Sequence, residues 1–211
     1  MQKALIFDFD GTLIDSAPVV CNILNEMRRE RGMEKMEYDL LKKFLSLGGK
    51  EMVGFALEVE DGLDELVGEF RKRYREKKAD REMLYEGALE ALELLRELGW
   101  ILVICTNKPR FLVEKILEEL KMGDFFAFIN AGGDFEYKKP HLSNIQACLE
   151  FLGEKPMAYL GDSVVDQQTA KNGGLDFYFF EGGYDDGVDR SQAAFTFQHY
   201  NELVSHLGLK K

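Results

Sequence analysis

Cysteine, proline and long apolar runs are scarce in this chain. Only 3 of its 211 residues are cysteine and 4 are proline. The cysteines show no CxxC spacing, so a disulfide framework is not expected. Cys105 and Cys148 are interpreted as small buried thiols, which suit a reducing cytoplasm. The longest apolar runs, such as residues 100–105, are too short to span a bilayer, so no membrane partner is expected.

Positive charge is also in short supply. The chain carries 38 acidic residues against 27 lysines and arginines, which gives a formal net charge of -11. Nucleic acid and anionic membrane surfaces are therefore not expected as partners, because both attract basic proteins. A small phosphorylated metabolite remains compatible with this charge, since a few local cations and a metal ion can dominate one pocket. The sequence leaves the oligomeric state open.

Several short apolar runs indicate strands that are buried on both faces. They do not alternate polar and apolar residues, which is typical of a parallel sheet covered by helices. Helical periodicity lies between them, as in residues 88–98 and in the segment that Pro109 opens. This alternation predicts an α/β fold with a doubly wound, Rossmann-like parallel sheet. The expected strands are Ala4–Phe7, Ile101–Ile104, Phe125–Ile129, Met157–Leu160 and Phe177–Phe180.

One region contains no strand-like run. Residues 16–83 read as a series of amphipathic helices. The sequence therefore predicts an α/β core made of residues 1–15 and 84–211, with residues 16–83 inserted after the first strand as a small helical domain. The expected helices of this domain are Val19–Arg31, Tyr38–Leu47, Met52–Glu58 and Leu63–Lys78.

Polar residues follow three of the expected strands. Ligands of open α/β sheets bind at the carboxyl ends of the strands, so we expect these polar groups to converge at one edge of the sheet. The first strand is followed by Asp8-Phe9-Asp10-Gly11-Thr12, the second by Thr106-Asn107-Lys108, and the fourth by Gly161-Asp162-Ser163.

These residue types suit phosphoryl transfer, which needs a nucleophile, a proton carrier and positive charge around the phosphoryl oxygens. Asp8 ends a strand and can act as a carboxylate nucleophile. Asp10 can protonate the leaving oxygen and later accept a proton from water. Thr106 and Asn107 can donate hydrogen bonds to phosphate, and Gly11 permits the tight turn after the strand.

A hard dication would let two carboxylates accept an anionic substrate. Magnesium suits a site of few carboxylates, phosphate and water. Asp162 is the best distant ligand for it. Asp166, four residues later, is expected in the first turn of a helix, where a carboxylate is favoured with or without metal. We assign Asp166 a supporting role at the metal site, which it can fill through a bound water molecule.

Four motifs carry a resemblance to a known family. The segment from Asp8 to Ser16 resembles motif one of the haloacid dehalogenase-like hydrolase superfamily, DxDGTLxDS. Residues 104–108 resemble motif two, Lys139-Pro140 resembles motif three, and the segment from Gly161 to Asp166 resembles motif four, GDSxxD. The resemblance covers nearly the whole chain. It is closest to the phosphoglycolate phosphatase-like branch, whose helical cap lies between motifs one and two.

The resemblance implies a magnesium-dependent phosphatase for small phosphate monoesters, with an aspartyl-phosphate on Asp8 and phosphoglycolate as the leading substrate. It implies that the Asp10 main-chain carbonyl is a magnesium ligand. It places Lys139 against the nucleophile and the phosphate. A cap loop around Lys50 would face the substrate's distal group. The loop at residues 182–184 is interpreted as structural.

Other activities of the same superfamily remain open. Sugar phosphomutases commonly have a cap histidine and often valine in place of Thr12, whereas residues 16–83 contain no histidine and Thr12 is present. Dehalogenases need no metal and lack an acid at the Asp10 position. Pyrophosphatases and nucleotidases share nearly the same core motifs. A phosphate-binding or regulatory protein without turnover is also possible, because fold does not determine function.

Overall fold

The computed structural model describes residues 3–154 and 156–209. The chain divides into two compact units. One contains the chain up to Asp15 and from Asp80 onward, and the other is Ser16–Ala79. The residues 80–83 belong to the first unit, where the Asp15 N–H donates a hydrogen bond to the Met83 carbonyl at 2.7 Å.

The first unit is built on a six-stranded parallel sheet with the order β3-β2-β1-β4-β5-β6. This confirms the expected α/β class. All five expected strands are present, and the short β6 was missed because three residues give too little periodicity to detect. The strands are β1 (Ala4–Phe7), β2 (Ile101–Pro109), β3 (Phe128–Gly132), β4 (Ala158–Gly161), β5 (Asp176–Phe180) and β6 (Phe195–Phe197).

Two strands, β2 and β3, differ from the expectation by more than one residue at a boundary. The third strand begins at Phe128, because Gly123–Phe125 forms the 3-10 turn η3 instead of extended backbone. The second strand continues past Ile104 to Pro109, with an irregular register against β3 between Cys105 and Pro109. An apolar run marks which residues are buried but does not mark where the extended backbone begins and ends.

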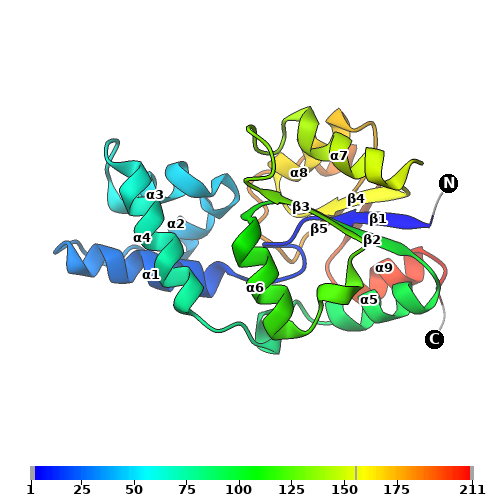
Figure 1. Ribbon diagram of the computed structural model, residues 1–211, viewed down its shortest axis with the longest axis horizontal. Coiled ribbons are helices and arrows are strands. Elements are labelled where there is room, and N and C mark those ends of the chain that lie inside the picture. The colour runs from blue at the N-terminus through cyan, green and yellow to red at the C-terminus, as the bar shows by residue number, and fades with distance from the viewer. Residues whose placement is uncertain (1–2, 155, 210–211) are drawn as a thin grey trace. The chain divides into compact units, whose positions relative to one another are not determined.

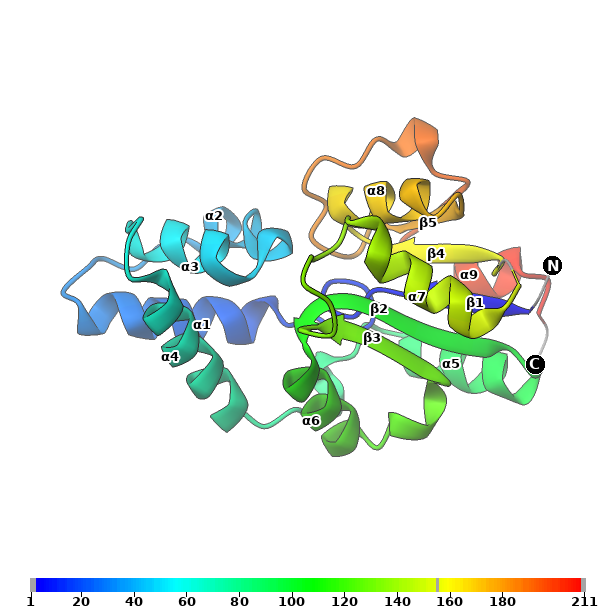
Figure 2. The same cartoon turned by 45° about the horizontal axis from the view of Figure 1, so that its top comes forward.

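Helices cover both faces of this sheet (Figure 1). The helices α7 and α8 pack on one face, and α5, α6 and α9 lie on the other, as the second view also shows (Figure 2). Coverage on both faces explains why the strands are continuously apolar. The helical elements of this unit are η2 (Arg81–Met83), α5 (Ala88–Glu97), α6 (Arg110–Leu120), η3 (Gly123–Phe125), α7 (Leu142–Leu152), α8 (Val164–Asn172), η4 (Arg190–Gln192) and α9 (Tyr200–His206).

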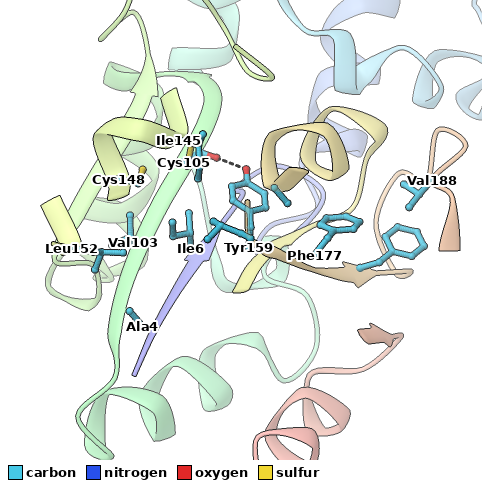
Figure 3. Packing of buried hydrophobic residues seen from close by; sticks show 13 residues of the cluster. Ala4, Ile6, Val103, Cys105, Ile145, Cys148, Leu152, Tyr159, Phe177 and Val188 are labelled. Carbon is cyan, nitrogen blue, oxygen red and sulfur yellow. Dashed lines mark hydrogen bonds between the residues drawn. The ribbon is translucent and has the colours of Figure 1, made fainter. Parts of the chain in front are cut away.

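A buried cluster fills the layer between the sheet and the helices α7 and α8 (Figure 3). It includes Ile6 from β1, Val103 and Cys105 from β2, and Tyr159 from β4, all of them 0% exposed. Cys148 joins the cluster from α7, and every cysteine of the chain is buried and free, as expected for Cys105 and Cys148. The cluster makes the sheet a rigid base for the residues at its edge.

The parallel register brings the end of β1 level with the middle of β2 and with the end of β4. Phe7 at the end of β1 pairs with Ile104 of β2 and with Leu160 of β4. The chain runs from β1 to β2 and β3 on one side, then returns to β4 on the other side of β1. Ligands bind at such reversals of strand order. The residues that follow β1 and β4, and those of β2 beyond Ile104, are therefore placed around one point.

The second unit is helical. The expected helix at Tyr38–Leu47 is instead two short elements, which keep both Leu41 and Leu45 buried. No helix among residues 3–154 and 156–209 is both long and apolar enough to cross a membrane. The elements of this unit are α1 (Ala17–Glu30), α2 (Tyr38–Lys42), η1 (Leu45–Leu47), α3 (Gly49–Leu57) and α4 (Leu63–Glu76).

Candidate active site

Three aspartates form a compact cluster at the carboxyl edge of the sheet. Asp8 directly follows β1, Asp162 directly follows β4, and Asp166 lies in the first turn of α8. Each offers a carboxylate oxygen, and these oxygens lie within 4.8 Å of one another. The Asp8 N–H donates to the Leu160 carbonyl at 2.9 Å, which fixes the end of β1 against β4. This cluster could hold a metal ion.

Lys139 is the cation of this cluster. Its ammonium lies 2.9 Å from Asp8 Oδ1 and 2.7 Å from Asp166 Oδ1, and its side chain is only 2% exposed. It also donates to the Tyr159 hydroxyl at 2.8 Å. Its hydrogen bonds go to Asp166 and Tyr159, while Asp8 Oδ1 is an ion-pair partner that accepts no hydrogen bond. Lys139 is therefore held in a single position beside Asp8.

The burial of these charges shifts their pKa values. Burial, reinforced by repulsion from Asp166, raises the pKa of Asp8 from its ordinary 3.8 to about 7, although Lys139 opposes this shift. Burial and the Asp166 charge likewise hold the pKa of Asp162 well above its usual range. Burial would lower the pKa of Lys139, but the Asp166 and Asp8 carboxylates raise it overall. One ammonium does not balance three buried carboxylates.

Asp166 is already saturated with hydrogen bonds. Its Oδ2 accepts from the Ser163 hydroxyl at 2.6 Å and from the N–H groups of Asp162 and Ser163 at 3.2 Å each. Its Oδ1 faces Lys139 and the Tyr159 hydroxyl at 3.1 Å. With Ser163 it forms a capping box at the start of α8. The Tyr159 hydroxyl has one proton and donates it to the Cys105 carbonyl, so four donors remain for the roughly four acceptor positions of this carboxylate. A metal bound directly by Asp166 would have to displace one of them.

Asp162 is held by one hydroxyl and one main-chain amide. Its Oδ1 accepts from the Thr12 hydroxyl and its Oδ2 from the Tyr184 N–H, both at 2.8 Å. Each oxygen therefore keeps a second lone pair. A Cβ at Gly183 would lie 2.3 Å from both the Asp162 Cβ and the Gly11 carbonyl oxygen. The loop at 182–184, interpreted from sequence as structural, thus shapes the site directly.

Gly11 is required for a steric reason. It has a φ of 79°, and a Cβ there would lie 2.2 Å from Asp162 Oδ2. A side chain at this position would be strained and would also displace the carboxylate. This agrees with the tight turn expected after the first strand.

Asp10 is paired with a lysine that the sequence did not single out as a site residue. Lys108 Nζ lies 2.7 Å from Asp10 Oδ1 and 3.0 Å from Oδ2. The Lys108 side chain is 5% exposed, whereas that of Asp10 is 25% exposed. The two residues are 98 positions apart in the chain, so no local pattern could have indicated the contact.

The side chains of Thr106 and Asn107 have different hydrogen-bond partners. The Thr106 hydroxyl accepts a 3.3 Å hydrogen bond from the Lys108 N–H, so its own proton can be donated elsewhere. The Asn107 side chain instead clamps the Lys139 main chain. Its Nδ2 donates to the Lys139 carbonyl at 3.1 Å, and its Oδ1 accepts from the Lys139 N–H at 2.7 Å. Asn107 thereby connects motif two to motif three.

Tyr159 is a second residue that sequence reasoning missed. Its buried hydroxyl accepts from Lys139 and lies 2.9 Å from the Cys105 carbonyl, to which it donates. Figure 3 shows this last bond between the labelled Tyr159 and Cys105. The side chain points to the same face as Ile6 and Val103, where a tyrosine looks like an ordinary core residue. The only sequence signal was its place three residues before Asp162.

Lys50 belongs to the helical unit. It lies at the start of α3 and forms an ion pair with Asp64 at 2.7 Å. Both side chains are largely exposed, at 52% and 87%. An exposed pair of this kind contributes little to stability, about 0–1 kcal/mol. Lys50 can therefore exchange Asp64 for another anion at small cost.

This chain is similar to known proteins over most of its length. The sequence model of the haloacid dehalogenase-like hydrolase family matches residues 5–180. The chain is 34% identical over 190 residues to a phosphoglycolate phosphatase of Rhodobacter capsulatus, covering 87% of this chain and 86% of that protein. It is 35% identical over 181 residues to a phosphoglycolate phosphatase of Chromobacterium violaceum, covering 82% of each.

A solved structure shows the same fold. The crystal structure described as a predicted phosphoglycolate phosphatase from Haemophilus somnus 129pt superposes with a TM-score of 0.86. The match covers 98% of both chains at 24% identity. At this identity the likeness concerns the arrangement of the elements alone.

Proposed function

Because this chain belongs to the haloacid dehalogenase-like hydrolase family, we propose that it is a Mg²⁺-dependent phosphatase of small organic phosphate monoesters. The single observation that carries the proposal is the pairing of Asp8, at the rigid end of β1, with the buried cation Lys139. A carboxylate held beside an ammonium is arranged to attack a phosphoryl group. The curated relatives named above make phosphoglycolate the leading candidate substrate.

The first step transfers the phosphoryl group to the protein. A carboxylate oxygen of Asp8 forms a bond to phosphorus, and the bond from phosphorus to the ester oxygen breaks. Asp10, as a carboxylic acid, gives its proton to that leaving oxygen, so the alcohol departs neutral at this atom. Lys139 and the Thr106 hydroxyl stabilise the charge on the phosphoryl oxygens. The result is an aspartyl-phosphate on Asp8.

The second step regenerates the enzyme. A water molecule attacks phosphorus, and Asp10, now a carboxylate, accepts its proton. The bond from Asp8 to phosphorus breaks, which releases inorganic phosphate and restores the Asp8 carboxylate. One residue thus acts as acid and then as base, and the proton count returns to its starting value.

The residues of the cluster fit a hard dication. Burial raises the pKa of Asp8 and of Asp162, and repulsion from the Asp166 charge adds to both shifts, so a cation at this point would relieve both effects. One oxygen of Asp8, the main-chain carbonyl of Asp10 and a remaining lone pair of Asp162 would hold Mg²⁺. When bound, it supplies positive charge that keeps Asp8 ionised and offsets the charge of the phosphate. Asp166 supports this site by positioning Lys139 and the start of α8.

The remaining expected residues have supporting roles in the proposal. Thr106 and the Asn107 main-chain amide donate to the phosphate, while the Asn107 side chain holds Lys139. Gly11 gives the phosphate access to the turn after β1. The helical unit, which carries Lys50, is the proposed cap, and a cap of this kind would exclude bulk water during the reaction.

The experiment is a measurement of phosphate release from a panel of monoesters, with Mg²⁺ and with EDTA. The panel holds 2-phosphoglycolate, pyrophosphate, nucleoside monophosphates and sugar phosphates. We expect Mg²⁺-dependent release dominated by 2-phosphoglycolate, abolished by Asp8→Asn. Asp124→Asn, at an exposed position in η3, is the matched control and keeps full activity.

Two results would contradict the proposal. Full activity of Asp8→Asn would rule out the aspartyl-phosphate. Conversion of β-glucose 1-phosphate to glucose 6-phosphate without phosphate release would instead indicate a sugar phosphomutase. Borohydride reduction of acid-quenched enzyme gives an independent readout, because it converts an aspartyl-phosphate at position 8 to homoserine.

A further inference from the structure

The ion pair between Lys108 and Asp10 is not explained by the phosphatase mechanism. Lys108 is almost fully buried, and its ammonium contacts both oxygens of Asp10. Burying an ammonium costs several kcal/mol unless good partners compensate it. The site already has Lys139 for the nucleophile and the phosphate. A second buried cation beside the general acid therefore calls for a separate role.

The location of the acid determines what Lys108 can reach. To protonate the leaving oxygen, Asp10 must lie within about 2.6–3.2 Å of it. Lys108 Nζ lies 2.7 Å from Asp10 Oδ1. Only the Asp10 carboxyl group would therefore separate the ammonium from the ester oxygen of a bound substrate. It thus faces the departing alcohol, whereas Lys139 faces the nucleophile. A group attached close to the ester oxygen comes within reach of Lys108.

We propose that Lys108 recognises a carboxylate on the leaving alcohol and so selects phosphate monoesters with an anionic leaving group. In phosphoglycolate a single methylene carbon separates the ester oxygen from the carboxylate. That carboxylate replaces one Asp10 oxygen as an acceptor on the ammonium, and the displaced oxygen turns to the ester oxygen. This inference rests on the proposed phosphatase function and names the substrate class of that site.

Charge balance gives the selectivity its physical basis. The substrate brings a phosphate and a carboxylate to an edge that already holds Asp8, Asp10 and Asp162. A buried ammonium, already removed from water, binds a carboxylate without a further desolvation cost to itself. A neutral leaving group offers Lys108 no comparable partner. The preference therefore depends on the Lys108 charge rather than on the shape of the pocket.

The test compares two substrates that differ only in this charge. These are 2-phosphoglycolate and its neutral amide, 2-phosphoglycolamide, assayed as kcat/KM with Mg²⁺. The wild-type enzyme should prefer the carboxylate, and Lys108→Met should reduce that preference about 10- to 100-fold, because a hydrogen bond to a charged group is lost. The loss should appear mainly in the KM for 2-phosphoglycolate. Lys108→Arg, which keeps the charge, should retain most of the preference.

The ratio separates recognition from a purely structural role. If Lys108 only positions Asp10, Lys108→Met lowers kcat/KM for both substrates equally, the ratio is unchanged, and the inference is wrong. A wild-type enzyme that does not prefer the carboxylate also overturns it. Lys171→Met, on the exposed side of α8, controls for the loss of one positive charge. If no monoester releases phosphate with any variant, the proposed function itself fails and the inference falls with it.

Discussion

Removal of divalent metal should make the stability of this protein depend on the ionisation of Asp8. Burial is the main cause that raises the pKa of Asp8 from 3.8 to about 7, and Asp166 adds repulsion. The folded protein therefore binds a proton more tightly than the unfolded chain. A contribution of this sign is fully present below pH 3.8 and is lost as the pH rises through about 7.

The magnitude follows from the two pKa values. Each pKa unit corresponds to about 1.4 kcal/mol, so the difference between 3.8 and about 7 represents about 4 kcal/mol of unfolding free energy. Most of the titration of the folded state lies near neutral pH. About 2.5 kcal/mol of the loss should fall between pH 5 and pH 8.

Urea unfolding in EDTA measures this effect when wild type and Asp8→Asn are compared. Asparagine cannot ionise, so the stability of the Asp8→Asn variant lacks the pH-dependent contribution of Asp8 at every pH. Between pH 5 and pH 8, the unfolding free energy of the variant should rise by about 2.5 kcal/mol relative to that of the wild type. Added Mg²⁺ should close this gap at the higher pH, because a cation beside Asp8 favours its charged form. Parallel stability curves for the two proteins in EDTA would refute the reasoning.

Two further substitutions test the supports of the site. Gly183→Ala places a methyl group against the metal-site carboxylate, so we expect at least about a tenfold loss of activity and a higher Mg²⁺ requirement. Gly123→Ala, where nothing lies near the added Cβ, is the control, and equal behaviour of the two would contradict the steric argument. Tyr159→Phe removes a hydroxyl that Lys139 needs, and it should cost about 1–3 kcal/mol of unfolding free energy and lower kcat more than it raises KM. Tyr178→Phe removes another buried tyrosine hydroxyl, which contacts His206 at 3.3 Å instead of Lys139, and it should leave kcat unchanged. A Tyr159→Phe enzyme with unaltered kcat would show that the Tyr159 hydroxyl is dispensable.

Several features could be predicted because they depend on local pattern and on one topological rule. Continuous apolar runs identified five strands, since residues buried on both faces must all be apolar. The position of Asp8 and Asp162 at one edge followed, because the carboxyl ends of parallel strands meet there. The start of a helix near Asp166 followed from its position four residues after Asp162, which directly follows the fourth expected strand. None of these inferences required a side-chain contact.

Other features could not be predicted because competing local structures differ by small free energies. The break between α2 and η1 keeps the same leucines buried as one continuous helix would, so the apolar pattern cannot distinguish them. The late start of β3 has the same origin, because apolar residues suit a 3-10 turn as well as a strand. The helical periodicity of residues 63–76 was strong enough to identify α4 without such ambiguity.

The sequence by itself determined the class of fold, the order of the motifs and the carboxylates that gather at the sheet edge. Only the tertiary structure decided how their side chains are engaged. Asp166 accepts hydrogen bonds from Ser163, directly before α8, and from Lys139, which ties the start of the helix to the cation of the site. Lys108 pairs with Asp10 across 98 residues of chain. The physical reason is that hydrogen bonds act over about 3 Å, a scale set by packing and side-chain rotamers that the periodicity of the chain does not encode.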